Sequence, residues 1–449
     1  MEEYTNSYIV EAIDLTHDAM GVCKLEDGYT VFVEDLLKGE TAEIIITRRK
    51  KNYGFGKIVQ RITKSPFRVM PKCQHFAECG SCGLMHMDYD VQLSFKKYRV
   101  ETSIRHVHAD SATIKDMLGM TNPYNYRNKV EIKFAQGEKG IEAGFFQAKS
   151  HTLVNLQECH IMAKRSFETL TLIKNICNEL KIKAYEEKKA GGVLRSVVIK
   201  ESYATGEIVL LFNTAKEFPE AKTFVAKLLA KIPEISGIGY TITDDESAMS
   251  TDPIVMMHGN DYLTDVINGI TYKIGMRSFF QTNTAQTEIL YAKAMEYAGL
   301  NKHEKLIDAY CGIGSIGLQA ASQCYKVFGI EIIRSSIRDA KNNASINKIK
   351  NAFFEVGDVE TVLEKWKKFN FDVIVVDPPR RGCSQGFINA LLTMKIPRIV
   401  YVSCDQATLA RDIALLEDGG YQMVEVTPID MFPQTIHVET ITLLSLKTA

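Results

Sequence analysis

Apolar and polar residues alternate in four short segments near the N-terminus, which is the pattern of strands that bury one face. β-Branched residues are frequent in these segments, as is usual in strands. The segments are SYIVEAIDL, YTVFVEDL, ETAEIIITRRKK and GFGKIVQRI. Four short strands separated by turns predict a small β-barrel over residues 1–62.

The middle of the chain combines helical and strand patterns. An amphipathic stretch from Tyr89 to about His108 predicts a helix. A strand-rich region then opens with PYNYRNKV and runs to about residue 275, with helices expected near 163–188 and 218–231. We expect its sheet to be antiparallel and mixed. Together with a cluster of cysteines, this pattern predicts a central β-rich domain over residues 63–275.

Strands and helices alternate from Thr284 onward. The strands are continuous apolar runs, as expected for strands that are buried on both faces. Repeated β-α units predict a Rossmann-like, doubly wound and mostly parallel sheet over residues 276–449, so the whole chain is predicted to be an α/β and β multidomain protein. The expected elements are a helix at 284–298, strands at 305–310, 326–332, 351–358 and 371–379, and helices after GIGSIG, at 335–347 and at 358–366.

Composition narrows the class of protein. The 449 residues suffice for about three domains of roughly 150 residues each. The 54 basic and 55 acidic residues leave a net charge of −1, so a nucleic-acid surface must be local. The N-terminus is acidic and polar, and no apolar run approaches the ~20 residues that cross a bilayer. We therefore expect a cytoplasmic protein that does not bind membranes.

A local basic surface is predicted at the end of the barrel. Residues 44–65 contain seven basic side chains and no acidic one, with Tyr53 and Phe55 between them. Cationic side chains next to aromatic rings suit an RNA backbone and its stacked bases. The alternative is a basic hairpin that is merely solvated.

Three cysteines, Cys73, Cys79 and Cys82, lie close together, and Cys159 follows far downstream. The ten cysteines are too sparse for a disulfide framework, and clustered thiols in a cytosolic chain favour a metal site. Four soft ligands fit a four-iron four-sulfur cluster or a structural zinc ion, and spacing alone does not separate them. Three close cysteines and one remote one are more usual for iron–sulfur. Cys159 could instead be a core cysteine, and other candidate ligands are His75, His86 and His160.

A glycine-rich turn follows the predicted strand 305–310, within LIDAYCGIGSIG. Its glycines allow the backbone to approach a ligand where the next helix begins, and Glu331, at the end of the following strand, can bind two ribose hydroxyls. This motif indicates an adenosine-containing cofactor, either NAD or S-adenosylmethionine.

The motif FDVIVVDPPRRG separates these two cofactors. It places Asp377 at the carboxyl end of a buried strand, where sheets of this kind bind ligands. An Asp-Pro-Pro tip is typical of methyltransferases and has no role in hydride transfer, so it favours S-adenosylmethionine. The alternative is an acidic turn after a strand.

Two further groups are expected at the same crevice. Cys404 follows the apolar strand RIVYV and precedes a helix whose dipole favours a lowered thiol pKa, so we interpret it as a nucleophile rather than a buried inert thiol. Glu439, in PQTIHVET, lies near the last strand and could serve as a base. Taken alone, Glu439 is better explained as an ordinary strand carboxylate.

In these residues the chain resembles the bacterial 23S ribosomal RNA (uracil-5)-methyltransferases, which make 5-methyluridine from S-adenosylmethionine. The resemblance spans almost the whole chain, including an OB-like TRAM domain and the cysteine cluster. It departs from the family where SCNP is replaced by SCDQ, and where Gly80-Ser81 replaces two glycines. The motifs that carry it are PYNYRNK, GGVLRS, SFFQTN, DAYCGIGSIGL, DPPRRG, SCDQATLARD and HVET.

The resemblance implies roles for individual residues. Cys404 would add to carbon 6 of uracil, and Glu439 would remove the proton from carbon 5. The substrate would be a loop or bulge uridine of 23S rRNA that is flipped out of its stack, and we expect a monomer. A four-iron four-sulfur cluster would be held by Cys73, Cys79, Cys82 and Cys159, and S-adenosylmethionine by Gln281, Tyr310, Glu331, Asp358 and Asp377.

Three rival functions stay open at this point. A tRNA uracil methyltransferase shares the chemistry, although those relatives usually lack both the TRAM domain and the cluster. A non-catalytic iron–sulfur RNA-binding protein and an NAD-dependent oxidoreductase are the others. RNA cytosine-5 methyltransferases carry a second cysteine directly after the proline of this motif, whereas Arg380 follows Pro379 here, which favours uracil.

Overall fold

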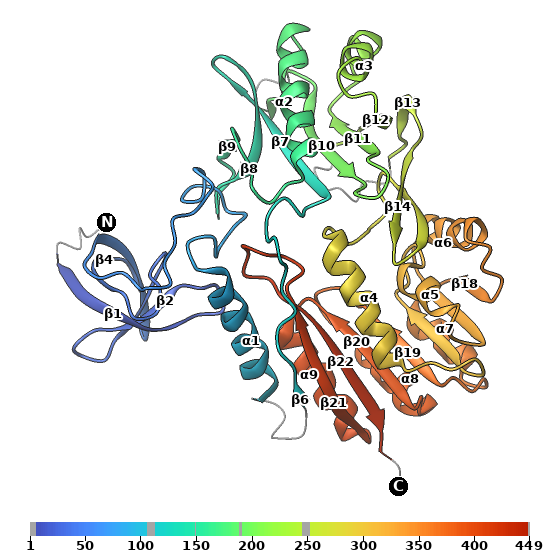
Figure 1. Ribbon diagram of the computed structural model, residues 1–449. Coiled ribbons are helices and arrows are strands. Elements are labelled where there is room, and N and C mark those ends of the chain that lie inside the picture. Colours follow the sequence, from blue (N-terminus) through green and yellow to red (C-terminus); the bar gives the residue numbers. More distant parts are fainter. Residues whose placement is uncertain (1–5, 106–112, 149, 188–190, 245–251, 448–449) are drawn as a thin grey trace.

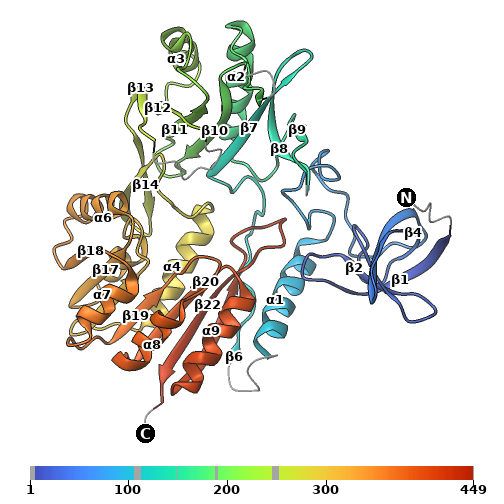
Figure 2. The same ribbon diagram turned by 180° about the vertical axis from the view of Figure 1, so that it is seen from behind.

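The computed structural model describes residues 6–105, 113–148, 150–187, 191–244 and 252–447. An N-terminal barrel lies at one side of the molecule, and a central sheet lies above a large C-terminal sheet (Figures 1 and 2). No helix in these described ranges is long and apolar enough to cross a membrane. The domain boundaries drawn from the sequence stay predictions.

The N-terminal strands form the closed barrel that the alternating pattern predicted, in the order β1-β2-β3-β5-β4. Every second side chain points inward, and those of Val31, Val33, Ile44 and others are buried together. The strands are β1 (Ser7–Leu15), β2 (Gly21–Lys24), β3 (Thr30–Val33), β4 (Thr41–Arg49) and β5 (Tyr53–Arg61).

A buried charge network joins the barrel to the segment that follows it. The side chain of Glu40 is fully buried and accepts hydrogen bonds from Arg61, at 3.1 Å, and from Arg68, at 2.5 Å. Burial opposes ionisation, but the hydrogen bonds from Arg68 and from two backbone N–H groups lower the pKa of Glu40 below its ordinary value. The barrel therefore has a fixed attachment to the chain beyond residue 62.

The central sheet has the order β13-β12-β11-β10-β7-β8-β9. It is antiparallel and mixed, as predicted, with the parallel pair β11 and β12 among antiparallel neighbours. Helices α2 (Lys164–Glu179) and α3 (Ala221–Leu229) pack on it. The strands are β7 (Lys129–Gly137), β8 (Gly140–Phe146), β9 (Leu153–Asn155), β10 (Leu194–Glu201), β11 (Ile208–Thr214), β12 (Ile235–Ile242) and β13 (Val255–Gly259).

The helix expected at 163–188 is shorter than predicted. It ends at Glu179, and Lys181 adopts the left-handed conformation with φ of 56°. Beyond it, Ala184 and Glu186 form β-bridges with Leu194 and Gly191. The chain therefore turns back into extended structure, because these bridges satisfy backbone groups that a longer helix would otherwise pair.

The C-terminal sheet has the order β18-β17-β16-β19-β20-β22-β21-β6. The first five strands are parallel, and β22 is antiparallel to both of its neighbours. The mostly parallel fold expected from the alternating β-α units is confirmed. The strands are β6 (Thr113–Ile114), β16 (Lys305–Ala309), β17 (Lys326–Glu331), β18 (Ala352–Val356), β19 (Val373–Val376), β20 (Arg398–Ser403), β21 (Tyr421–Ile429) and β22 (Glu439–Leu446).

Alternate residues of these strands bury opposite faces. Leu306 and Val373 pack with helices of one face, and Ile307 and Ile374 pack with helices of the other. Both faces are covered, which explains the continuous apolar runs in the sequence. One face carries α4 (Thr284–Ala298), α5 (Ser315–Ala320) and α6 (Arg334–Ile346); the other carries α1 (Tyr89–Arg105), α7 (Val359–Trp366), α8 (Gln385–Met394) and α9 (Gln406–Asp418).

Segments from the predicted central domain also contribute to the C-terminal core. Helix α1 packs against α9, and the hairpin of β14 (Tyr262–Ile267) and β15 (Ile270–Gly275) buries Tyr272 in the same apolar cluster as α4. The predicted helix from Tyr89 is described as far as Arg105, and its expected last residues lie outside the described ranges. Helix α1 thus packs on the C-terminal sheet rather than on the central one.

Candidate active site

Three reactive side chains meet at one edge of the C-terminal sheet. Asp377 follows β19 and Cys404 follows β20, so both lie at the carboxyl ends of parallel strands. Glu439 is the first residue of β22, where Thr440 pairs with Ser403 of β20. Because an antiparallel strand begins where its neighbour ends, Glu439 joins the other two at the edge where such sheets bind ligands.

Cys404 is half-buried beside this acid. Burial and the charge of Glu439 raise the pKa of Cys404 to about 11, while the charge of Arg380 acts in the opposite direction. The expectation that the helix after Cys404 lowers this pKa is wrong, because burial and the acid outweigh the helix dipole. The site therefore holds a thiol at neutral pH, which becomes nucleophilic only after it loses its proton.

The two carboxyl groups have strongly displaced pKa values. Burial and repulsion from Asp377 raise the pKa of Glu439 well above its ordinary value. Burial raises the pKa of Asp377 to about 7. Two carboxyls that repel each other in a water-poor site retain a proton near neutral pH. Displaced pKa values of this kind cluster where protein groups transfer protons.

The glycine turn and Glu331 form a second part of the site. Strand β17 ends at Glu331, and its carboxylate accepts hydrogen bonds from the N–H groups of Gly312, at 3.2 Å, and Ile333, at 2.9 Å. A Cβ atom on Gly312 would meet nothing within 4 Å, so this backbone borders open space. Tyr310 has a φ of 65°, which a non-glycine residue keeps only when its surroundings enforce it. An acidic group beside an open glycine turn fits a ribose.

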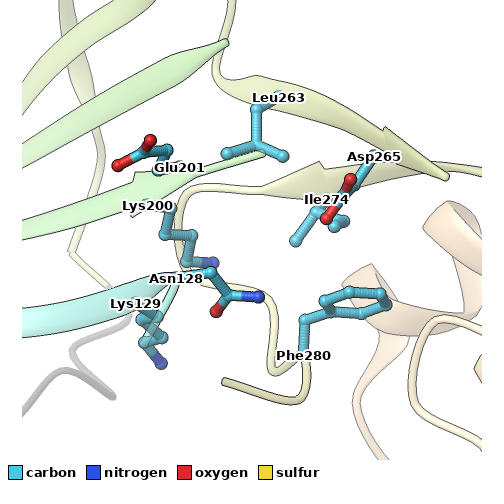
Figure 3. A pocket seen from close by; sticks show the side chains of 8 residues that line it. All are labelled: Asn128, Lys129, Lys200, Glu201, Leu263, Asp265, Ile274 and Phe280. Atoms are coloured by element: carbon cyan, nitrogen blue, oxygen red, sulfur yellow. The ribbon is translucent and has the colours of Figure 1, made fainter. Parts of the chain in front are cut away.

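Gln281 is buried on the loop between β15 and α4. The side-chain amide of Asn128 donates to the Gln281 carbonyl at 3.2 Å. The Lys200 ammonium donates to the carbonyls of Gly275, at 2.6 Å, and Ser278, at 2.8 Å. A cavity of about 10 Å³ adjoins Lys200 (Figure 3), which is room for about one water molecule. This buried lysine therefore supports the loop that carries Gln281.

The same loop carries two phenylalanines with different environments. Phe280 is buried and packs against Tyr272 with their ring centroids 5.8 Å apart. Phe279 is 66% exposed. Of this pair, Phe279 alone is free to stack on a base.

Asp358 lies after β18 at the same edge of the sheet, two strands from the glycine turn. One of its carboxylate oxygens accepts hydrogen bonds from the N–H groups of Glu360 and Thr361, so it caps helix α7. Its side chain is exposed, which leaves the other carboxylate oxygen open to a ligand.

The four cysteines of the predicted cluster lie near one another. Burial raises the pKa of Cys82, and the charges of Cys159, Cys79 and Cys73 raise it further. All ten cysteines are free thiols. In the described part of the chain, no three His, Cys, Asp or Glu side chains have the arrangement of a metal-ion site. The iron–sulfur cluster therefore stays a prediction.

The histidines near these cysteines have other surroundings. His75 accepts a hydrogen bond from the N–H of Gln157 at 3.1 Å, and His160 lies 3.3 Å from the carboxylate of Glu158. His86 is buried near Asp35 of the barrel, 3.7 Å away. These contacts fit structural roles better than metal binding.

Comparison with known proteins identifies the family. The family described as tRNA (Uracil-5-)-methyltransferase matches residues 88–447, and the TRAM domain family matches residues 9–59. The chain belongs to the tRNA (uracil-5-)-methyltransferase family. It is therefore an RNA uracil-5-methyltransferase that uses S-adenosylmethionine, and the barrel is a TRAM domain.

Relatives of the methyltransferase align along nearly its full length. An uncharacterized RNA methyltransferase of Bacillus cereus is 41% identical over 437 residues, covering 96% of this chain and 95% of its own. One from Staphylococcus aureus is 40% identical and covers 97% of both chains. The crystal structure of the Pyrococcus abyssi tRNA (uracil-54, C5)-methyltransferase in complex with S-adenosyl-L-homocysteine aligns with a TM-score of 0.77 at 28% identity, covering 97% of this chain and 99% of its own.

Sequence reasoning did not assign three residues that shape the site of this methyltransferase. Arg380 acts electrostatically on Cys404 and Glu439, and its position directly after DPP was the available signal. Asp308 is buried and accepts from the Gly317 N–H at 2.7 Å, and burial raises its pKa to about 7. The signal in the sequence was an acidic residue within the apolar strand that precedes the glycine turn. Lys200 gave a similar signal within the strand LRSVVIKE.

We expect alkylation of Cys404 by iodoacetamide to accelerate about tenfold per pH unit between about pH 7 and pH 9, because the reactive thiolate is a minor species below a pKa of about 11. Mass spectrometry of the peptide that contains Cys404 measures the rate. Arg380→Gln should slow alkylation by removing a favourable charge, whereas Arg381→Gln is the matched control. A rate that stops rising below pH 8 would contradict the raised pKa.

Proposed function

We propose that this methyltransferase converts specific uridines of 23S rRNA to 5-methyluridine through a covalent adduct between Cys404 and the uracil ring. The observation that carries the proposal is the meeting of a half-buried thiol with the buried Glu439 at the ligand-binding edge of the sheet. In the described part of the chain, neither the Cys404 thiol nor the Glu439 carboxyl group has a hydrogen bond to another side chain that would give it a structural role.

Cys404 activates the uracil ring in this proposal. Carbon 5 of uracil is a poor nucleophile, and addition of the Cys404 thiolate to carbon 6 moves the ring electrons toward carbon 5 as an enolate. S-adenosylmethionine supplies an electrophilic methyl group on a sulfonium. As carbon 5 bonds to that methyl group, the methyl–sulfur bond would break and S-adenosylhomocysteine would leave. The positive charge of bound S-adenosylmethionine would also favour the ionised forms of the Cys404 thiol and the Asp377 carboxyl group.

Glu439 completes the reaction in this proposal. The methylated adduct carries both a methyl group and a hydrogen on carbon 5. The Glu439 carboxylate takes that proton, the C–H electron pair restores the double bond between carbons 5 and 6, and the Cys404 thiolate leaves. Asp377 and Gln281 hydrogen-bond the uracil edge or the cofactor amine, and Phe279 stacks on the flipped base.

The cofactor site is assigned to residues around the glycine turn. Glu331 binds the ribose hydroxyls, Tyr310 packs beside them, and Asp358 reaches the adenine. Asp377 and Gln281 bind the amino acid end of S-adenosylmethionine or the uracil. The support for this set is the position of Glu331, Asp358 and Asp377 at the ends of neighbouring strands at one edge of the sheet.

The barrel is proposed to bind RNA outside the reacting base. The rings of Phe32, Tyr53 and Phe55 lie within 6.0 Å of one another, on strands β3 and β5. Lys50 lies over the ring of Tyr53, and Arg49 lies over that of Tyr29. A cationic strip with partly exposed rings supports contact with the phosphate backbone and with unpaired bases of a loop or bulge.

The choice of 23S rRNA is supported by the family resemblance of the motifs around Cys404 and Glu439. One observation favours tRNA as a second candidate. The Pyrococcus abyssi tRNA methyltransferase covers 97% of this chain, so the barrel and the cysteine-bearing segment fall within the match. The sequence argument that tRNA enzymes lack both features therefore does not separate the two substrates. We further propose a monomer that acts in the cytoplasm.

The four-cysteine site is proposed to hold a four-iron four-sulfur cluster. The four cysteines are free thiols beside the apolar Met85, Tyr126 and Ile161, and burial together with the charges of Cys79 and Cys159 raises the pKa values of Cys73 and Cys82. A cationic cluster would stabilise such a donor set. When bound, the cluster would link the segment around Cys79 to Cys159. No step of the methyl transfer moves electrons, so we assign it a role in folding or RNA docking.

Cys404→Ala should reduce methyl transfer from labelled S-adenosylmethionine below detection, because uracil carbon 5 is then not activated. An RNA substrate with 5-fluorouridine at the target should become covalently attached to the unaltered enzyme, since fluorine cannot be removed as a proton. Cys383→Ala is the control, because Cys383 is buried against Tyr401. Full activity of Cys404→Ala would refute the proposed chemistry.

We expect labelled methyl groups to enter a 23S rRNA transcript and not a tRNA transcript, at one or two uridines in loops or bulges. Mapping of 5-methyluridine in rRNA from cells with and without the gene checks the result in vivo. Cys404→Ala serves as the blank in both assays. Methylation of tRNA alone would assign the enzyme to the second substrate and leave the uracil chemistry intact.

Anaerobically purified protein should be brown and contain about four irons per chain. Cys159→Ser should lose the colour and the iron because it removes a ligand, whereas Cys404→Ser should keep both and lose methylation. Metal analysis and visible absorption measure these outcomes. A colourless protein with one zinc per chain would replace the cluster by zinc, and an iron-free protein with unchanged activity and RNA affinity would remove the proposed role.

A further inference from the structure

The loop 430–438, which joins β21 to β22 and leads directly into Glu439, is held by helix α1. The Lys96 ammonium lies 2.5 Å from the Asp430 carboxylate, and both side chains are fully buried. Lys96 also donates to the Phe432 carbonyl at 3.0 Å, and the Tyr89 hydroxyl donates to Asp430 at 2.9 Å. The loop, red in Figure 1, lies between α1 and the central domain.

A second set of contacts holds the middle of this loop. The Gln92 side-chain amide donates to the Gln434 side chain at 3.0 Å, and the Gln434 N–H donates back to Gln92 at 3.2 Å. Gln434 has a φ of 70°, which a glutamine keeps only when its surroundings enforce it. Arg99 donates to the Ile436 carbonyl, so α1 contacts the loop at several successive positions.

The far end of the loop is tied to the nucleophile. Gln406, two residues after Cys404, donates from its side chain to the Val438 carbonyl at 2.9 Å. Ile429 and Glu439 pair across β21 and β22, so the loop starts and ends beside Glu439. Its conformation is therefore set by α1 on one side and by the helix after Cys404 on the other.

A buried ion pair adds little net stability, because desolvation of both charges offsets their attraction. The Lys96–Asp430 pair instead fixes the conformation of the loop, because the Lys96 ammonium has acceptors at two positions on it, the Asp430 carboxylate and the Phe432 carbonyl. The contact reaches across more than three hundred residues of sequence, from helix α1 to the loop that precedes β22. These contacts of α1 are all made with the loop 430–438, so we expect their loss to leave cofactor binding unchanged.

We propose that Lys96, together with Gln92, is a positioning residue that aims Glu439 at carbon 5 of the methylated adduct. This inference rests on the proposed function. Attack by Cys404 and methyl transfer precede the proton removal by Glu439 and do not need the base to be aimed. We call the contacts of Lys96 and Gln92 with the loop 430–438 the clamp. Loss of the clamp should slow the last step, in which the C–H bond breaks, the proton passes to Glu439 and the thiolate leaves carbon 6.

The test compares Lys96→Met/Asp430→Leu with the unaltered enzyme. The double variant removes both buried charges and leaves neither unpaired, which preserves folding better than Lys96→Met alone. Lys97→Met is the matched control, since Lys97 is the next residue of the same helix and pairs with the exposed Asp116. Gln92→Met provides a second, uncharged disruption of the clamp if the double variant does not fold.

The double variant should turn over on the order of 100-fold more slowly at an unchanged KM for RNA, as a small misplacement of a reacting group produces. It should accumulate a denaturant-resistant enzyme–RNA adduct that carries the labelled methyl group. Gln92→Met should show the same adduct with about a tenfold loss of rate, and Lys97→Met should match the unaltered enzyme.

Two outcomes would overturn the inference while leaving the proposed function standing. One is a folded variant with normal turnover, and the other is slow turnover without any methylated adduct, which would place the defect before methyl transfer. Failure of the proposed function gives a different result, because Cys404→Ala would then stay active and no variant would form an adduct.

Discussion

The pairing of β22 between β20 and β21 is the constraint on which the site depends. Because β22 runs antiparallel to β20, its first residue lies where the parallel strands end, and Glu439 is brought beside Cys404 and Asp377. Side chains alternate along a strand, so a slip of one residue would turn the Glu439 carboxylate to the opposite face. The apolar residues that follow, including Ile441 and Leu444, are buried on the two faces and oppose such a slip.

Burial at this edge decides the protonation of the groups it brings together. A thiol and two carboxyls lie close to one another, and the charge of the exposed Arg380 acts on both Cys404 and Glu439. Each anion disfavours the others, so the free site keeps its thiol neutral and shares a proton between its acids. In the proposed mechanism, the positive charge of bound S-adenosylmethionine would favour the thiolate, which would couple activation of Cys404 to the presence of the methyl donor.

The site also depends on contacts between regions that are far apart in sequence. Helix α1 packs on the C-terminal sheet and orders the loop before Glu439, while Lys200 of the central sheet orders the loop that carries Gln281. Barrel residues Ala19 and Leu37 pack with Phe95 of α1 and approach Ile436 of the same loop. The RNA-binding barrel and the proposed base are therefore connected through one packed helix.

The sequence by itself determined the features that depend on local pattern. Alternation predicted the barrel, apolar runs predicted the parallel strands, and the predicted helix 284–298 coincides with α4. Motifs at strand ends brought Glu331, Asp377 and Cys404 to one edge, because strand direction alone fixes that placement. Local pattern failed at residues 180–187, where β-bridges to Gly191 and Leu194 replaced the expected helix.

Only the tertiary structure decided the properties that depend on distant neighbours. The Cys404 pKa was expected to be low from the helix that follows it, and burial together with Glu439 makes it high. Phe279 and Phe280 are adjacent in sequence, yet packing against Tyr272 buries only the second of the two. Lys96 and Asp430 are 334 positions apart, and Cys404 and Glu439 come from different strands of the sheet. No local pattern encodes which of these residues meet.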